Sequence, residues 1–225
     1  MKVLAKKAKL SSRFYQPTTG FTLIEVLVVV VIVGALAAIA APSWLSFMNT
    51  QRVNKANDLI WSALQQAQQE AKKRKLGYSI SFRNNNNVPQ IAIYPKGSTV
   101  TNYWRDLGTD LRIQPGQILI QTNITNENTT DNSSPTYASS PVFTATSKPQ
   151  TITFDYTGAL DLTIKTGNAN STSVQNTNLG TKGLIVVVAM AKPGNPTQAY
   201  NIKRCIIMKT ILGAVKIGKN ENECS

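Results

Sequence analysis

The sequence predicts an α+β protein in which one long N-terminal helix is packed on a C-terminal antiparallel β domain. Two features of the 225-residue chain predict this fold. The first is an apolar run from Phe21 to Leu45 that leads into a stripe of apolar residues at helical spacing. The second is a series of short apolar runs separated by turn residues. We therefore expect a basic N-terminal segment (1–20), a helix (21–75) and a β-rich head domain (76–225).

The N-terminal segment is strongly basic. It holds five of the 24 basic residues and none of the 11 acidic ones. The five are Lys2, Lys6, Lys7, Lys9 and Arg13. Without this segment 19 basic residues remain against 11 acidic, so the net charge falls from +13 to +8. That excess permits an anionic partner such as DNA, a polysaccharide or a lipid surface, but it specifies none of them.

The run from Phe21 to Leu45 has the length and composition of a membrane-spanning helix. Its single charge is Glu25, and no residue from Val26 to Gln51 is charged. Its many valines form helix poorly in water, but lipid enforces a helix because every backbone polar group must be bonded internally. We place the span at about 21–48. The basic residues before it predict a cytoplasmic N-terminus and an exported remainder.

Two alternatives for this segment are a secretory signal peptide, with Ala38-Ile39-Ala40 as a small-x-small site, and a plain membrane anchor. Neither gives Glu25 a role. An ionisable group in a membrane segment costs roughly 2.5 to 3.5 kcal/mol on insertion scales, so its presence indicates a function.

The string Gly20-Phe21-Thr22-Leu23-Ile24-Glu25, between a basic leader and an apolar helix, resembles the type IV prepilin cleavage and methylation motif. The resemblance implies removal of leader 1–20 between Gly20 and Phe21 by a prepilin peptidase, and N-methylation of Phe21. Glu25 then becomes the fifth mature residue. We expect its carboxylate to pair with the amino terminus of a neighbouring subunit, because two costly charges in apolar surroundings are better paired than apart.

Gly34 and Pro42 interrupt the apolar run and predict local weakening of the helix, with kinking or partial melting near Pro42. The resemblance implies the same, since pilin stems carry a glycine and a proline at these distances and unwind between them inside filaments. Beyond the membrane, the helix from about 49 to 75 is amphipathic and should pack one apolar stripe on the head. The stripe consists of Val53, Ala56, Ile60, Ala63, Leu64, Ala67 and Ala71.

Short apolar runs after the helix predict the strands of the head. These runs are Tyr78–Phe82, Gln90–Tyr94, Gln117–Ile120, Thr151–Phe154, Leu160–Ile164, Leu184–Met190, Ile202–Met208 and Ile211–Ile217. Asn123–Pro141 and Gly167–Gly180 are polar and are expected to form long surface loops. The Asn-x-Ser/Thr strings at Asn123, Asn128, Asn132 and Asn170 are likewise interpreted as exposed loops.

The only two cysteines, Cys205 and Cys224, lie near the C-terminus. In an exported protein the simplest interpretation is one disulfide, worth roughly 3 kcal/mol on the chain-entropy model. A reduced pair is the alternative.

Several stretches of the helix end and the head resemble the GspH/FimT-type minor pilins and pseudopilins. They are Leu59–Lys75 at the helix end, Ile152-Thr153-Phe154-Asp155 with Gly158, and the Ile206–Lys216 strand pair around Gly213. Some members of that family bind DNA through a glycine-arginine-x-arginine string in the last hairpin. Here those positions read Gly213-Ala214-Val215-Lys216, so the string is not preserved. The candidate DNA-binding residues are the cations Lys203, Arg204, Lys209, Lys216 and Lys219, with a solvated hairpin edge as the alternative.

The chain offers little for catalysis. It contains no histidine, no phosphate-binding loop, no dinucleotide fingerprint and no CxxC pair, so we expect no enzyme and no cofactor. The resemblance implies a minor pilin or pseudopilin that initiates, caps or decorates a type IV pilus or type II secretion pseudopilus. Its partners would be other pilin or pseudopilin subunits, prepilin peptidase, inner-membrane assembly machinery and membrane lipid before assembly. The alternative is a DNA-binding minor pilin for DNA uptake. Either subunit would lie in the inner membrane before assembly and in a periplasmic or extracellular filament after it.

Overall fold

The computed structural model describes residues 20–109, 113–144, 147–166 and 173–225. Contacts between residues divide the chain into two compact units, Met1–Trp44 and Leu45–Ser225. One α-helix, α1 (Leu23–Arg74), begins in the first unit and ends in the second. All the strands belong to the second unit. The predicted α+β class, with one long N-terminal helix and an antiparallel β domain, is therefore confirmed.

The helix ends where local chemistry predicts. Lys72, Lys73 and Arg74 occupy its last turn, where cations interact favourably with the helix dipole. Lys75 follows with φ of 57°, the left-handed conformation that commonly terminates a helix. The observed C-terminal boundary thus lies one residue from the predicted one.

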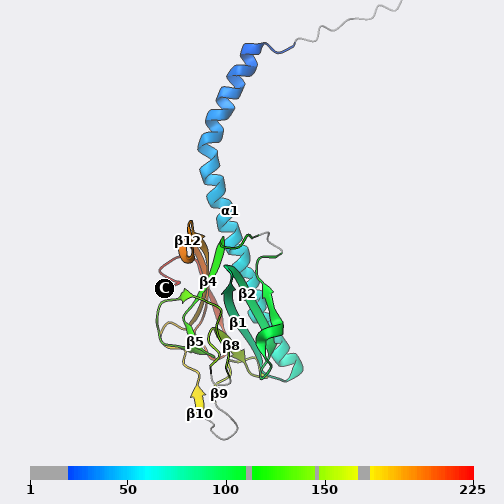
Figure 1. Cartoon of the computed structure of the whole chain (residues 1–225), viewed down its shortest axis with the longest axis vertical. Coiled ribbons are helices and arrows are strands. Elements are labelled where there is room, and N and C mark those ends of the chain that lie inside the picture. The colour runs from blue at the N-terminus through cyan, green and yellow to red at the C-terminus, as the bar shows by residue number, and fades with distance from the viewer. Residues whose placement is uncertain (1–19, 110–112, 145–146, 167–172) are drawn as a thin grey trace, which may run out of the picture. The chain divides into compact units, whose positions relative to one another are not determined.

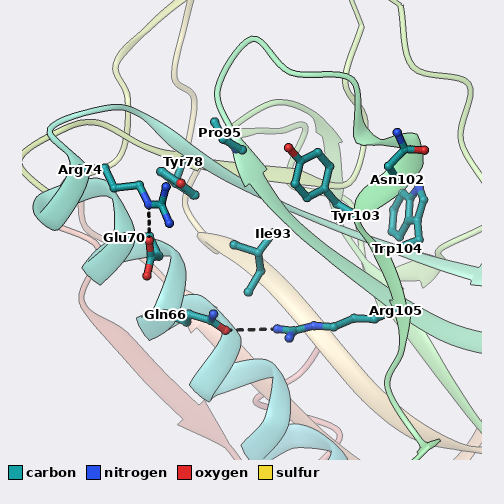
Figure 2. A pocket seen from close by; sticks show the side chains of 10 residues that line it. All are labelled: Gln66, Glu70, Arg74, Tyr78, Ile93, Pro95, Asn102, Tyr103, Trp104 and Arg105. Atoms are coloured by element: carbon teal, nitrogen blue, oxygen red, sulfur yellow. Dashed lines mark hydrogen bonds and ion pairs between the residues drawn. The ribbon is translucent and has the colours of Figure 1, made fainter.

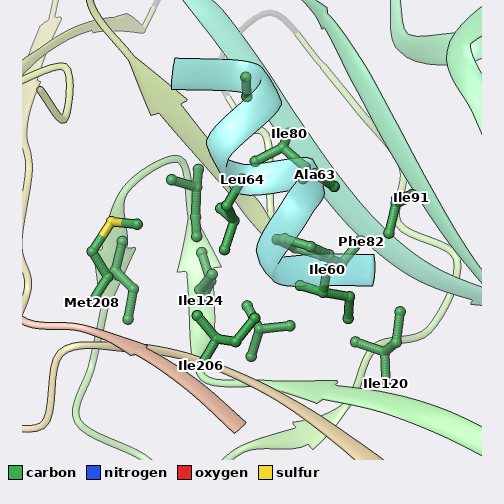
Figure 3. Packing of buried hydrophobic residues seen from close by; sticks show 14 of the residues in the cluster. Ile60, Ala63, Leu64, Ile80, Phe82, Ile91, Ile120, Ile124, Ile206 and Met208 are labelled. Carbon is green, nitrogen blue, oxygen red and sulfur yellow. The ribbon is translucent and has the colours of Figure 1, made fainter. Parts of the chain in front are cut away.

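The second half of α1 is held by burial of its apolar stripe. Seven residues were predicted to form this stripe, and each is at most 2% exposed: Val53, Ala56, Ile60, Ala63, Leu64, Ala67 and Ala71. Figure 3 shows Ile60 and Leu64 packed among strand residues such as Ile80, Phe82 and Ile206. The prediction that this half of the helix packs on the head domain is confirmed, because one core contains the stripe and residues of both larger sheets.

The head contains one 3₁₀ turn and thirteen strands among the described residues (Figure 1). They are β1 (Tyr78–Asn85), β2 (Val88–Pro95), η1 (Val100–Tyr103), β3 (Trp104–Asp106), β4 (Ile118–Thr122), β5 (Ile124–Asn126), β6 (Thr129–Thr130), β7 (Thr136–Tyr137), β8 (Thr151–Phe154), β9 (Thr163–Thr166), β10 (Ser173–Asn176), β11 (Leu184–Lys192), β12 (Asn195–Met208) and β13 (Val215–Gly218). A four-stranded sheet has the order β3-β2-β1-β8, and a five-stranded sheet has the order β13-β12-β11-β4-β7. The pairs β5–β6 and β9–β10 form two small sheets.

Every pairing between these strands is antiparallel. Two-residue turns join β1 to β2 and β11 to β12. Asn86 and Asn87 connect β1 to β2 with φ of 49° and 62°. Two consecutive positive φ values define the hairpin turn whose twist matches its strands, and asparagine tolerates them well.

The expectation of a surface loop over Asn123–Pro141 was wrong. This segment contains β5, β6 and β7, and Asn123 and Asn128 are at most 2% exposed. Their amides bond to backbone groups of neighbouring segments, which compensates for burying them. The Asn-x-Thr strings at these two positions therefore do not mark exposed sites. Asn132 is exposed as expected, and Asn170 lies outside the described residues.

Other parts of the head also differ from expectation. The strand expected at Leu160–Ile164 begins only at Thr163, and the one expected at Ile211–Ile217 begins at Val215. Thr210–Gly213 forms a turn instead, closed by the Gly213 N–H donating to the Thr210 carbonyl at 3.0 Å. The segment Gly167–Gly180, expected to be a loop, contains β10, and its residues 167–172 lie outside the described range.

Candidate functional site

The candidate processing site lies at the start of α1. Gly20 is exposed, and a Cβ placed on it would meet no atom within 4 Å. Phe21 is 81% exposed. The peptide bond between them is therefore sterically open in the isolated chain.

Glu25 lies in the first turn of the helix, behind Thr22. Its backbone N–H donates to the Thr22 hydroxyl at 3.3 Å and to the Thr22 carbonyl at 3.1 Å. Thr22 thus caps the helix, and a carboxylate three residues later is favoured by the helix dipole. No ion pair found among the described residues includes Glu25. Its charge therefore has a local electrostatic benefit in addition to any partner it meets during assembly.

The part of α1 that lies in the first unit displays an almost continuous apolar surface. One 18-residue window of α1 has a mean hydropathy of 3.0 and is not buried within the chain, so length and composition allow the helix to cross a membrane. The large side chains of this part of the helix are mostly more than half exposed, from Leu23 at 83% to Trp44 at 66%. Apolar surface on this scale requires lipid or other helices around it.

Gly34 and Pro42 both lie within α1, which is continuous from Leu23 to Arg74. Partial melting near Pro42 is therefore not seen in the isolated chain. Pro42 has no N–H to donate to the carbonyl four residues earlier, so one helical hydrogen bond is missing there. Unwinding inside a filament stays a prediction.

The candidate DNA-binding cations lie on or beside the β12–β13 hairpin. Lys203 and Arg204 are on β12, Lys216 is on β13 opposite Ile207, and Lys219 directly follows β13. Lys209 follows the other end of β12, about 20 Å from Lys203 at the rise of a strand. The fold therefore brings all five cations to one hairpin, with Lys209 at the start of its connecting loop, two residues beyond the Ile207–Lys216 pair.

The C-terminal segment engages these cations. The Lys203 ammonium lies 2.8 Å from the Glu221 carboxylate, and the Lys216 ammonium lies 3.3 Å from that of Glu223. The Arg204 guanidinium donates to the Lys219 carbonyl. Two of the hairpin's five positive charges are thus balanced by the protein's own acids.

A disulfide joins Cys205 of β12 to Cys224 of the C-terminal segment that carries Glu221 and Glu223. The predicted bridge is therefore confirmed, and both cysteines are at most 3% exposed. Gly218 permits the approach, because a Cβ at this position would lie 2.5 Å from the Cys205 sulfur. The bridge fixes the segment that carries Glu221 and Glu223 against the outer face of the hairpin.

Both acids have altered proton affinity. The hydrogen bond from the Lys203 side chain lowers the pKa of Glu221. The backbone N–H of Lys219 and the side chain of Lys216 lower the pKa of Glu223. Both carboxylates therefore remain ionised at neutral pH and continue to balance the cations.

A cavity of about 600 Å³ that sequence reasoning missed opens between α1 and the η1–β3 segment (Figure 2). Its walls come from Gln66, Glu70 and Arg74 on the helix, and from Asn102, Tyr103, Trp104 and Arg105 across from it. The one signal in the sequence is the group of two aromatic residues beside Arg105. These residues are far from Gln66, Glu70 and Arg74 in the sequence, so nothing in the sequence indicated that the two groups line one cavity.

Comparison with known families matches residues 18–41 to the prokaryotic N-terminal methylation motif. No curated protein and no solved structure matches the chain. The motif is followed by the long apolar helix, and the second unit is an antiparallel β domain packed on the end of that helix. These features together are those of a type IV pilin-like protein. They indicate a membrane-anchored structural subunit rather than an enzyme.

Proposed function

We propose that the protein is a minor pilin or pseudopilin, a subunit that initiates, caps or decorates a type IV pilus or a type II secretion pseudopilus. The observation that carries the proposal is the methylation motif at 18–41 on an apolar helix of membrane-spanning length. The assignment to the GspH/FimT type is supported by the sequence strings of the head alone.

In this proposal the subunit passes from membrane to filament. Prepilin peptidase cuts between Gly20 and Phe21 at the cytoplasmic face of the inner membrane, and Phe21 is N-methylated. The cut leaves the apolar helix in the lipid with the head outside. Inner-membrane assembly machinery then extracts the helix into the filament, where the exposed apolar surface packs on helices of other subunits.

Glu25 has a specific role in this step. Its carboxylate pairs with the methylated amino terminus of a neighbouring subunit, which fixes the axial register between the two helices. Glu25 is exposed in the first helical turn, and no ion pair found among the described residues includes it. This supports the proposal, because the carboxylate is open to a charged group of another subunit.

The proposal is tested by determining the N-terminus of the protein purified from its native membranes. A start at N-methylated Phe21 is expected. A start at Ala41, as after signal-peptide cleavage, or an uncleaved leader would exclude the proposal. A Gly20→Ala variant should block cleavage, whereas Gly34→Ala should leave it unchanged.

A second candidate is DNA capture during uptake, favoured by the gathering of Lys203, Arg204, Lys216 and Lys219 on one hairpin. The engagement of Lys203 and Lys216 by acids weakens it. A salt-sensitive gel shift that decreases in the Lys216→Ala, Lys219→Ala double variant would support it, with exposed Lys192→Ala as control. A gel shift of the same size in the parent and in the double variant would count against DNA capture by this hairpin.

A further inference from the structure

The cavity of Figure 2 and a smaller cavity beside it together form a groove along the helix. The smaller cavity, of about 220 Å³, is lined by Leu59, Ser62 and Ala63 of α1 and by Leu107. Both cavities are lined by Gln66 and Arg105, whose side chains are hydrogen-bonded at 3.3 Å. Helix residues from Leu59 to Arg74 thus border the groove, over about 22 Å at the rise of an α-helix.

The charges of the groove balance each other. Arg74 and Arg105 are opposed by Glu70, which bonds Arg74 at 2.7 Å, and by Asp106. A polyanion is held by several unopposed cations, one for each phosphate that it neutralises. The groove does not supply them, so its charges disfavour nucleic acid and other polyanions.

The rings that line the groove are held in place by their neighbours. The Arg83 guanidinium lies over the Trp104 ring at 4.0 Å, and the Phe143 ring packs against that ring at 6.0 Å. Tyr103 packs on the ring of Tyr94 at 5.9 Å, yet it remains 40% exposed. An exposed ring fixed in this way offers a stacking surface at little entropic cost.

Planar polar side chains surround these rings. Gln66 and Asn102 carry amides, which both donate and accept hydrogen bonds. Glu70 contributes acceptors, while Arg74 and Arg105 contribute donors, and the pairs Glu70–Arg74 and Gln66–Arg105 hold these groups in position. The groove therefore offers both kinds of hydrogen-bonding group beside an apolar ring, over a cavity volume typical of ligand sites.

We infer that this groove binds a neutral oligosaccharide. The apolar C–H face of a sugar ring stacks on the aromatic side chain, and its hydroxyls, each donor and acceptor, meet the amides, the carboxylate and the guanidinium groups. The open groove admits several linked rings along the helix. The inference goes beyond the proposed function and does not rest on it, because all the lining residues lie in the unit Leu45–Ser225.

The test uses the full chain in detergent micelles and a panel of neutral oligosaccharides built from hexoses and N-acetylhexosamines. The same sugars carrying carboxylate or sulfate groups, and single-stranded DNA, are included for comparison. Binding to at least one neutral sugar is expected. Tyr103→Ala and Asn102→Ala should each weaken it about tenfold, and Tyr103→Phe should largely retain it because the ring remains.

Tyr156→Ala is the matched control, since Tyr156 is an exposed tyrosine that does not line the groove. Its affinity should stay within about twofold of the parent. Absence of binding to every neutral sugar would overturn the inference. So would binding confined to the charged sugars or DNA, or affinities that Tyr103→Ala and Asn102→Ala leave unchanged in variants with parental circular dichroism.

Discussion

Buried asparagines connect segments of the head that do not pair as regular strands. The Asn128 amide nitrogen donates to the carbonyls of Thr153 at 2.8 Å and Asp161 at 3.0 Å, and its oxygen accepts the Thr153 N–H at 2.8 Å. Asn84 bonds in the same manner to Ile120 and Ala138. Each side chain thus substitutes for a missing peptide group.

The change Asn128→Ala should destabilise the fold by about 2 to 4 kcal/mol. It leaves the buried Thr153 N–H without a partner and removes one of the bonds to the carbonyls of Thr153 and Asp161. It also places alanine at a φ of 50°, where asparagine is better tolerated. The measurement is chemical unfolding in micelles. The exposed Asn222→Ala should change the free energy of unfolding by less than about 0.5 kcal/mol. Equal effects of the two changes would show that the Asn128 bonds contribute little.

Acid pH should weaken the ion pairs between the C-terminal segment and the hairpin, while the Cys205–Cys224 disulfide keeps the segment attached. Because folding lowers the pKa of Glu221 and Glu223, their stabilising contribution is present above their ordinary value of 4.5 and is lost as the pH falls through their lowered values. NMR titration of the two carboxyl carbons should give both pKa values below 4.5. Lys216→Ala should raise the pKa of Glu223 and leave that of Glu221 unchanged. Ordinary values in the parent protein would contradict the observed contacts.

Residues of this kind were the least predictable part of the sequence. Asn123 and Asn128 stand in polar strings that are typical of exposed loops, and yet both are buried. An asparagine that satisfies backbone groups has the same local sequence as one that meets water. Only the distant partner distinguishes them, and for Asn128 that partner is Thr153.

At the scale of elements, the periodicity of apolar residues predicted α1 and its buried stripe. The longer strands β1, β2, β4, β8, β11 and β12 were also predicted, because each contains an apolar run. The strands β3, β5, β6, β7 and β10 have four residues or fewer and polar sequences, so no period could reveal them. Pairing with neighbours, rather than intrinsic preference, makes them strands.

The stripe of α1 should dominate the stability of the head. Ile60 is fully buried in the shared core, so Ile60→Ala should cost about 2 to 5 kcal/mol through lost burial and the cavity left behind. Asp58 is exposed on the same helix and provides the control, with Asp58→Ala expected to change stability by less than about 0.5 kcal/mol. Thermal unfolding followed by near-ultraviolet circular dichroism measures both. A small loss for Ile60→Ala would mean that the helix packs only loosely on the sheets.

At the scale of the whole molecule, one half of α1 packs on the head, and the other half presents an apolar surface to its surroundings. The half of α1 in the unit Leu45–Ser225 buries a narrow stripe within the chain, while the half in the unit Met1–Trp44 leaves its apolar side chains exposed. The sequence predicted this division, since charges return only after Gln51 and the stripe begins at Val53. It could not predict the groove, which combines helix residues with Tyr103 and Arg105 from a distant segment.

The central claim is that Glu25 pairs between subunits, and the structure supplies a control that separates this role from helix capping. Thr22→Ala removes the hydroxyl that caps the helix but keeps the carboxylate, whereas Glu25→Ala keeps the cap and removes the charge. The deciding measurement is the fraction of each variant found in isolated filaments, with cleavage verified. The account predicts a large loss for Glu25→Ala and near-parental incorporation for Thr22→Ala. Incorporation of Glu25→Ala at the parental level would contradict it.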